Sequence, residues 1–122
     1  MGIFSFGSKK NDLSWIRMIG ADQVEQLFEK DGRAKLVFKH STRCSISSMA
    51  LRRFEGSGIL ENSTVECWYL DLLSYRAISE EIAHQSHVVH QSPQAILFVD
   101  GQMCYAESHG MIDAEQILQI IA

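Results

Sequence analysis

Apolar and polar residues follow one another along this chain in periods that predict helices and strands in turn. Apolar residues at helical spacing after Asp22 predict a first helix that ends near residues 31–32. The apolar, β-prone run over 34–40 predicts a buried strand. The later predicted elements are a strand over 64–70, a helix over 75–85, strands over 95–99 and 102–106, and a helix capped by Asp113.

A second helix is predicted between Cys44 and the glycine-rich break at residues 56–58. Ser41 and Thr42 precede it and are residue types that cap helix starts. Ile46, Met49, Ala50 and Phe54 recur at helical spacing within it and form an apolar stripe.

The predicted order is α-β-α-β-α-β-β-α. Its two leading β-α units imply right-handed crossovers between neighbouring parallel strands. Asp100-Gly101 is a strong hairpin signal and adds an antiparallel pair. We therefore expect an α/β protein with a mixed four-stranded sheet and helices on both faces, which is the arrangement of the thioredoxin-like fold. Residues 13–122 form the single predicted domain, and residues 1–12 are expected to be a loose N-terminal tail.

Charge and composition narrow the class of partner. The 122 residues carry a net charge of −4 with scattered Lys and Arg, so we expect no nucleic-acid partner. No apolar run is long enough to cross a bilayer, and no secretory signal is recognisable, which predicts a cytoplasmic protein without a membrane partner. The three widely spaced cysteines fit neither a disulfide framework nor a zinc site, so we expect a reducing compartment.

Cys44 is the candidate reactive group because it lies between a predicted buried strand and a predicted helix. Free N–H groups and the dipole at a helix start stabilise a thiolate, which is the nucleophilic form of cysteine. Arg43 is placed to hold an anionic substrate. Ser47 stands where a dithiol oxidoreductase has its second cysteine, so a thiol from elsewhere must resolve any mixed disulfide. The alternative is that Cys44 is simply a small buried residue.

Pro93, the only proline, opens a predicted strand after Ser92. In a thioredoxin-type sheet a cis-proline at this place lies against the cysteine, and the backbone of the preceding residue can pair with a substrate chain. An ordinary trans proline at a strand start is the alternative.

Three stretches carry a family resemblance. Residues 38–47 read F-K-H-S-T-R-C-S-I-S and resemble the active-site stretch of the YtxJ-type monothiol bacilliredoxins, typically F-K-H-S, two variable residues, then C-P-I-S. Residues 90–95 read H-Q-S-P-Q-A and resemble that family's H-E-S-P-Q-A segment, and residues 106–109 fall where the family has an A-S-H-W-like run. The resemblance implies that Cys44 attacks and that Ser92 and Pro93 contact the substrate backbone. The other residues expected to bind substrate are Arg43, Ser45, Ile46 and Ser47.

The family also implies a substrate class. It predicts a thiol–disulfide oxidoreductase of monothiol type that removes bacillithiol from S-thiolated client proteins. The co-substrate is then a low-molecular-weight thiol, bacillithiol or one like glutathione, with no bound cofactor and no metal. The chain departs from the pattern at Ser45, where proline is usual, at Gln91 for glutamate and at Gly110 for tryptophan, which bears on substrate preference. His109 ends the last strand and receives no role.

Two other functions remain open at this stage. One is a binding or redox-sensing module that keeps the fold without catalysis. The other is an iron–sulfur carrier of the monothiol glutaredoxin kind, although such proteins have C-G-F-S where this chain has Cys44-Ser45-Ile46-Ser47. The spacing of His84, His87 and His90 permits a metal site, but a solvated helix end is the simpler interpretation. Cys67 and Cys104 are expected to pack rather than react.

Overall fold

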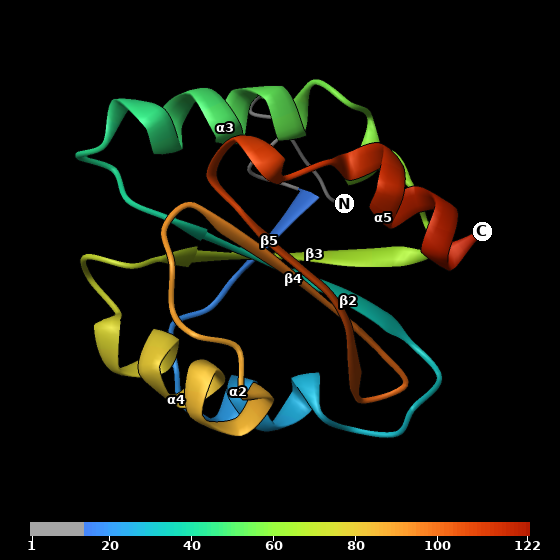
Figure 1. Cartoon of the computed structure of the whole chain (residues 1–122). Helices are drawn as coiled ribbons and strands as arrows, with labels where there is room; N and C mark the ends of the chain where they lie inside the picture. Colours follow the sequence, from blue (N-terminus) through green and yellow to red (C-terminus); the bar gives the residue numbers. More distant parts are fainter. Residues whose placement is uncertain (1–13) are drawn as a thin grey trace, which may run out of the picture.

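A five-stranded mixed sheet between two layers of helices makes up the protein (Figure 1). The computed structural model describes residues 14–122, and the tail expected at residues 1–12 lies outside them. The elements in chain order are β1 (Trp15–Arg17), α2 (Asp22–Leu27), β2 (Ala34–His40), α3 (Ser45–Glu55), η1 (Ile59–Glu61), β3 (Val65–Asp71), α4 (Arg76–Ser86), β4 (Gln94–Val99), β5 (Gln102–Ser108), η2 (His109–Met111) and α5 (Ala114–Ile121).

The strands lie in the order β1-β3-β2-β4-β5. β3 pairs in parallel with both β1 and β2, whereas β4 is antiparallel to β2 and to β5. The α/β class and the mixed sheet are therefore as predicted, but the sheet has five strands, not four. The missed strand, β1, has only three residues and one buried side chain, too short to show a period. Trp15 holds it in place by stacking on Phe54 and donating a 2.8 Å hydrogen bond to Glu55.

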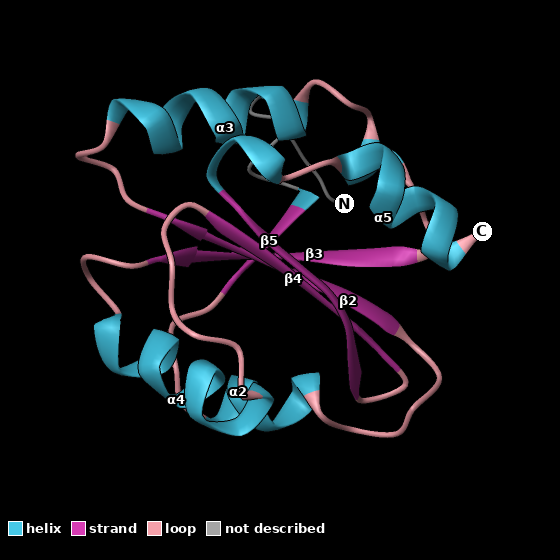
Figure 2. Cartoon of the chain, in the orientation of Figure 1, coloured by secondary structure: helices cyan, strands magenta, loops and turns pink. Residues whose placement is uncertain are grey.

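Helices α3 and α5 cover one face of the sheet, and α2 and α4 cover the other (Figure 2). Alternate residues of β2 point to opposite faces, so Leu36 and Phe38 pack beneath α3 while Val37 packs toward α4. All seven residues of β2 are buried, including Lys39 and His40. The central strand thus carries two polar side chains into the interior beside the turn that holds Cys44.

Two predicted helices differ in detail from the observed ones. Asp22 is the first residue of α2, and this helix ends at Leu27 rather than near residue 31. The first helix after β2 is capped by Cys44, not by Ser41 or Thr42. Its buried side chains are Ser47, Ala50 and Phe54, while Ile46 and Met49 of the predicted apolar stripe are 59% and 61% exposed.

The hairpin and the last helix cap are as predicted. Asp100 and Gly101 both adopt positive φ, 52° and 79°, as a tight turn between β4 and β5 requires. A Cβ on Gly101 would lie 2.6 Å from the carbonyl oxygen of Phe28, so this position needs glycine for space as well as for conformation. The Asp113 side chain accepts a hydrogen bond from the Glu115 N–H and begins α5.

Candidate thiol site at the strand-to-helix turn

Three chain segments meet at the end of the sheet where β2 and β3 finish and β4 begins (left in Figure 1). Lys39 of β2 pairs with Gln94 of β4. Continuing this antiparallel register by one residue places Pro93 beside His40. We call this the thiol end of the sheet, because the turn from His40 to Cys44 leaves it and the segment Ser92-Pro93 enters it. The sequence motifs around the cysteine and the proline therefore meet in space.

Cys44 is the N-cap residue of α3, with extended backbone angles of φ −109° and ψ 122°. An N-cap side chain is placed to accept hydrogen bonds from the free N–H groups of the first turn. Within residues 14–122 the Cys44 side chain makes no such capping bond, so these donors are available to a sulfur anion. The first turn carries no acidic residue, and the neighbouring Arg43 is exposed. The local field at Cys44 thus favours negative charge.

The turn is held from beneath by Ser47. Its hydroxyl oxygen lies 2.7 Å from Nδ1 of His40 and accepts a 3.0 Å hydrogen bond from the Ser41 N–H. The Cys44 N–H in turn donates to the Ser41 carbonyl at 3.2 Å. Burial lowers the pKa of His40, although the nearby Asp71 and Glu55 oppose this, so the ring in this network is neutral at pH 7.

Ser47 therefore occupies a different place from the one expected of it. Its side chain is fully buried and bonded inside the turn, so it offers no surface to a substrate. Ser45 and Ile46 are exposed on the outer side of the same helical turn, where a substrate can reach them. The first turn of α3 thus has an inner residue that fixes its position and two outer residues available for contact.

The Ser92–Pro93 peptide bond is cis, as the thioredoxin-type arrangement predicts. The Pro93 carbonyl accepts a 2.9 Å hydrogen bond from the His109 N–H, which gives the backbone of His109 a role that its sequence position did not reveal. The Ser92 hydroxyl is buried and has no hydrogen-bond partner among residues 14–122. A buried hydroxyl without a partner at the thiol end of the sheet is a donor available to a ligand or a water.

The other two cysteines differ from Cys44 in their surroundings, and all three are free. Cys67 pairs with Leu36, four residues before the end of β2, which places it roughly 13 Å from the thiol end of the sheet. Burial raises the pKa of the Cys67 thiol to about 12. Partial burial also raises the pKa of Cys104, which lies on β5. Neither cysteine lies at a helix start, as Cys44 does.

A polar cluster on the α4 side of the sheet was missed by sequence reasoning. Lys39 is fully buried, and its Nζ donates a 3.3 Å hydrogen bond to the Ser79 carbonyl and lies 3.4 Å from Nδ1 of His90. The signal that could have revealed it is a lysine that directly follows the apolar residues 36–38 inside a strand predicted to be buried. His90 thus packs against β2 rather than joining His84 and His87, and residues 14–122 contain no group of side chains arranged to hold a metal.

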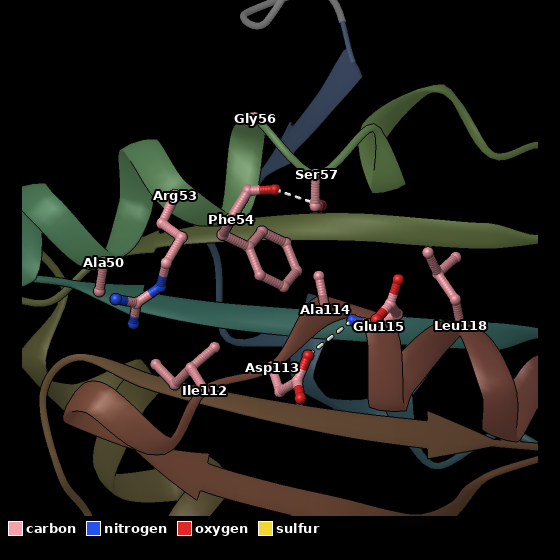
Figure 3. Close-up of a pocket in the computed structure, with 10 residues that line it drawn as sticks. All are labelled: Ala50, Arg53, Phe54, Gly56, Ser57, Ile112, Asp113, Ala114, Glu115 and Leu118. Carbon is pink, nitrogen blue, oxygen red and sulfur yellow. Dashed lines mark hydrogen bonds between the residues drawn. The ribbon is translucent and has the colours of Figure 1, made fainter.

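A cavity of about 430 Å³ lies between the second half of α3 and the start of α5 (Figure 3). Apolar side chains such as Phe54 and Ile112 line it, together with Arg53 and the capping residue Asp113. None of the predicted site residues contributes to it. This cavity is therefore separate from the thiol end of the sheet.

Comparison with known proteins identifies relatives of this chain. A family model described as monothiol bacilliredoxin BrxC matches residues 17–117. A solved structure described as a candidate oxidoreductase with a thioredoxin fold is 32% identical, with a TM-score of 0.77, over 92% of this chain and 97% of that chain. The matched range includes both Cys44 and the Ser92-Pro93 segment.

More distant solved structures share the fold. A thioredoxin mutant from Halobacterium salinarum NRC-1 is 17% identical, with a TM-score of 0.66 over 94% of this chain and 93% of its own. Mitochondrial thioredoxin 3 from Saccharomyces cerevisiae is also 17% identical, with a TM-score of 0.65 over 92% of this chain and 97% of its own. These two comparisons confirm the thioredoxin-like fold. Within the described residues, no helix is long and apolar enough to span a membrane.

Proposed function

This chain belongs to the monothiol bacilliredoxin family, and on that premise we propose that it removes bacillithiol from S-bacillithiolated proteins by thiol–disulfide exchange at Cys44. The observation that carries the proposal is the pair formed by Cys44 and Ser47. Cys44 caps α3 beside unused N–H donors. Ser47 stands where a dithiol enzyme has its resolving cysteine, and its hydroxyl is bonded to His40. The reaction therefore begins on one sulfur and needs a second thiol from solution.

The first step transfers the small thiol from the client to the protein. The Cys44 thiolate attacks the bacillithiol sulfur of the mixed disulfide, and a new sulfur–sulfur bond forms as the old one breaks. The client cysteine leaves as a thiolate and takes a proton from water. The N–H groups of the first turn of α3 stabilise the Cys44 anion before attack. They no longer act on a negative charge once the new bond has formed.

The second step regenerates the free thiol. A bacillithiol thiolate from solution attacks the bacillithiol sulfur now bonded to Cys44, which releases the Cys44 thiolate and bacillithiol disulfide. The electrons come from the incoming small thiol. Cys67 is an unsuitable internal substitute, because it is buried in the sheet and its pKa is raised to about 12.

A protein client is supported by exposed apolar side chains near Cys44. Ile46 and Met49 are 59% and 61% exposed on α3, and Val89, in the segment that leads to Ser92, is 77% exposed. Exposed apolar side chains on the helix that begins at Cys44 and on the segment that leads to Ser92 favour contact with another protein. In this proposal the backbone of Ser92 pairs with an extended client segment, and the exposed Arg43 pairs with a carboxylate of the small thiol.

All three cysteines are free, which supports a reducing compartment such as the cytoplasm as the site of this reaction. The identity of the small thiol is the most specific part of the proposal. Bacillithiol and glutathione both carry carboxylates, so Arg43 does not separate them, and the family supports bacillithiol.

Release of the small thiol from a client tests the function. The same client protein, carrying either bacillithiol or glutathione, is incubated with wild type or Cys44→Ser in the presence of the matching free thiol. We expect rapid release of bacillithiol by wild type, slower release of glutathione, and no catalysed release by Cys44→Ser. Partner capture that survives Cys44→Ser without any catalysed release would instead support a binding module.

A further inference from the structure

The segment that carries Ser92 to the thiol end of the sheet is fastened to the body of the protein by a buried polar cluster. Nδ1 of His90 lies 2.9 Å from the Ser79 hydroxyl and 3.4 Å from Nζ of Lys39. The same Nζ donates to the Ser79 carbonyl at 3.3 Å. Lys39 and Ser79 are both fully buried. His90 thus joins the segment over residues 87–92 to both β2 and α4.

The hydrogen bonds of this cluster depend on the charge of His90. The Lys39 ammonium has only donors to offer, so it needs acceptors in the interior. Neutral His90 with an unprotonated Nδ1 supplies one, and the Ser79 carbonyl supplies another. A proton on Nδ1 would remove that acceptor and bring two cations to 3.4 Å from each other, where Lys39 is fully buried and His90 half-buried. The arrangement therefore matches neutral His90 alone.

Burial and the cations around His90 also favour its neutral form. Burial lowers the pKa of His90, and the cations of Lys39 on β2 and Arg76 on α4 lower it further, while Glu80 on α4 raises it. Gln94, which faces Lys39 from β4, is uncharged. His90 is consequently neutral at pH 7 and gains its proton only in acid.

We propose that Lys39, Ser79 and His90 form a proton-sensitive clasp that holds residues 87–92 where Ser92 and Pro93 meet a client, and that the clasp closes only with uncharged His90. This rests on the proposed function for its catalytic consequence, but its structural part stands on the cluster itself. His90 is then a positioning residue: it acts on client binding and leaves the chemistry of Cys44 unchanged.

A second set of hydrogen bonds also holds the segment over residues 87–92. The Gln94 side chain donates a 3.0 Å hydrogen bond to the Val89 carbonyl and accepts one of 3.4 Å from the Gln91 N–H. Opening of the clasp therefore loosens the segment without unfolding the sheet. The expected result is a loss of client recognition in acid beyond the loss caused by fewer thiolates.

Three variants separate the acceptor role of His90 from its charge. His90→Ala removes the acceptor, and His90→Asn keeps an acceptor oxygen near the place of Nδ1 but cannot titrate. His84→Asn is the matched control, because His84 is an exposed histidine on α4. For each protein, client release and iodoacetamide alkylation of Cys44 are measured between pH 5.5 and 7.5, and amide hydrogen exchange of residues 87–92 is followed at the same pH values.

At pH 7.5 we expect His90→Ala to lower kcat/KM for the S-bacillithiolated client about tenfold, mainly through KM, with an unchanged alkylation rate. His90→Asn should stay within about threefold of wild type. In wild type and His84→Asn, the ratio of client release to alkylation should fall toward pH 5.5, and exchange of residues 87–92, corrected for its intrinsic pH dependence, should rise. In His90→Asn both quantities should stay constant.

Two results would overturn the clasp. One is wild-type catalysis and loop exchange that match those of His90→Asn at every pH, and the other is a His90→Asn protein that behaves like His90→Ala. A wild type that shows the predicted loop exchange but releases no bacillithiol would contradict the proposed function and support the clasp. If His90→Ala does not fold, the comparison between wild type and His90→Asn alone decides.

Discussion

The hydroxyl oxygen of Ser47 lies 2.7 Å from Nδ1 of His40, so the first turn of α3 is tied to the last residue of β2. The turn that carries Cys44 lies between these two residues. Where a dithiol enzyme uses a second cysteine to resolve its mixed disulfide, this protein uses a serine to fix the backbone. One side chain therefore accounts both for the position of Cys44 and for its need of an outside thiol.

Loss of the Ser47 hydroxyl should destabilise the protein. Ser47→Ala leaves the Ser41 N–H and the buried His40 ring without their partner, at a cost of about 1–3 kcal/mol. Urea denaturation at pH 7.5 measures this change in the free energy of unfolding. Ser48→Ala, at the half-buried next position on α3, is the control and should change the free energy by no more than about 0.5 kcal/mol. Equal stability of the two variants would contradict the bracing role of Ser47.

Removal of the exposed apolar side chains on α3 should separate protein clients from small substrates. We expect the double variant Ile46→Ser and Met49→Ser to raise KM for an S-bacillithiolated protein severalfold, because both side chains are more than half exposed beside Cys44. Its exchange with bacillithiol disulfide should stay unchanged. Ile120→Ser, at an exposed position on α5, is the control. An equal loss with both substrates would mean that these side chains support Cys44 itself.

The buried Lys39 should give the protein a distinctive pH dependence. Burial lowers the pKa of Lys39 from its ordinary value of 10.5 to about 8. Between these values the unfolded chain holds a proton that the folded protein has released, so the free energy of unfolding rises with pH. At about 1.4 kcal/mol per pKa unit, the full rise is about 3 kcal/mol.

Lys39→Met removes this titration and keeps much of the volume. As the pH rises from 8 to 10.5, the free energy of unfolding of wild type should therefore increase relative to that of Lys39→Met. Urea denaturation curves at several pH values measure it, and contributions from other groups cancel in the difference. A difference that does not change with pH would show that Lys39 titrates normally.

The cysteines should differ sharply in their reaction with an alkylating reagent. Cys67 is buried in β3 and burial raises its pKa to about 12, so it should stay unlabelled in the folded protein at pH 8. Mass spectrometry after a short iodoacetamide pulse should find labels on Cys44 and Cys104 only. The third label should appear when urea unfolds the chain. Rapid labelling of Cys67 without denaturant would contradict its burial.

Much of the fold follows from local sequence signals. The run over 34–40, the Asp100-Gly101 turn and the Asp113 cap all predict their elements, because each depends on residues close in the chain. The strand β1 could not be predicted in this way, because three residues are too few to show a period. Its Trp15 is held by contacts with Phe54 and Glu55, which are distant in the sequence.

The candidate site was predictable in its motifs and unpredictable in its interior contacts. Cys44 and Pro93 each stand in a recognisable stretch, and the register between β2 and β4 brings those stretches together. The contacts of Lys39 with Ser79 and His90 join three separate elements, which no spacing rule links. The helical stripe that includes Ile46 and Met49 predicts an apolar face but not whether the protein or a partner covers it.

The most direct test of the central claim is the mass of the intact protein after incubation with an S-bacillithiolated client in the absence of free thiol. The account predicts that wild type gains the mass of one bacillithiol bound through a disulfide, that peptide mapping places it on Cys44, and that the client loses the same mass. Cys44→Ser should show no adduct and leave the client modified. An adduct on Cys104, or loss of bacillithiol from the client that proceeds equally with Cys44→Ser, would contradict the account.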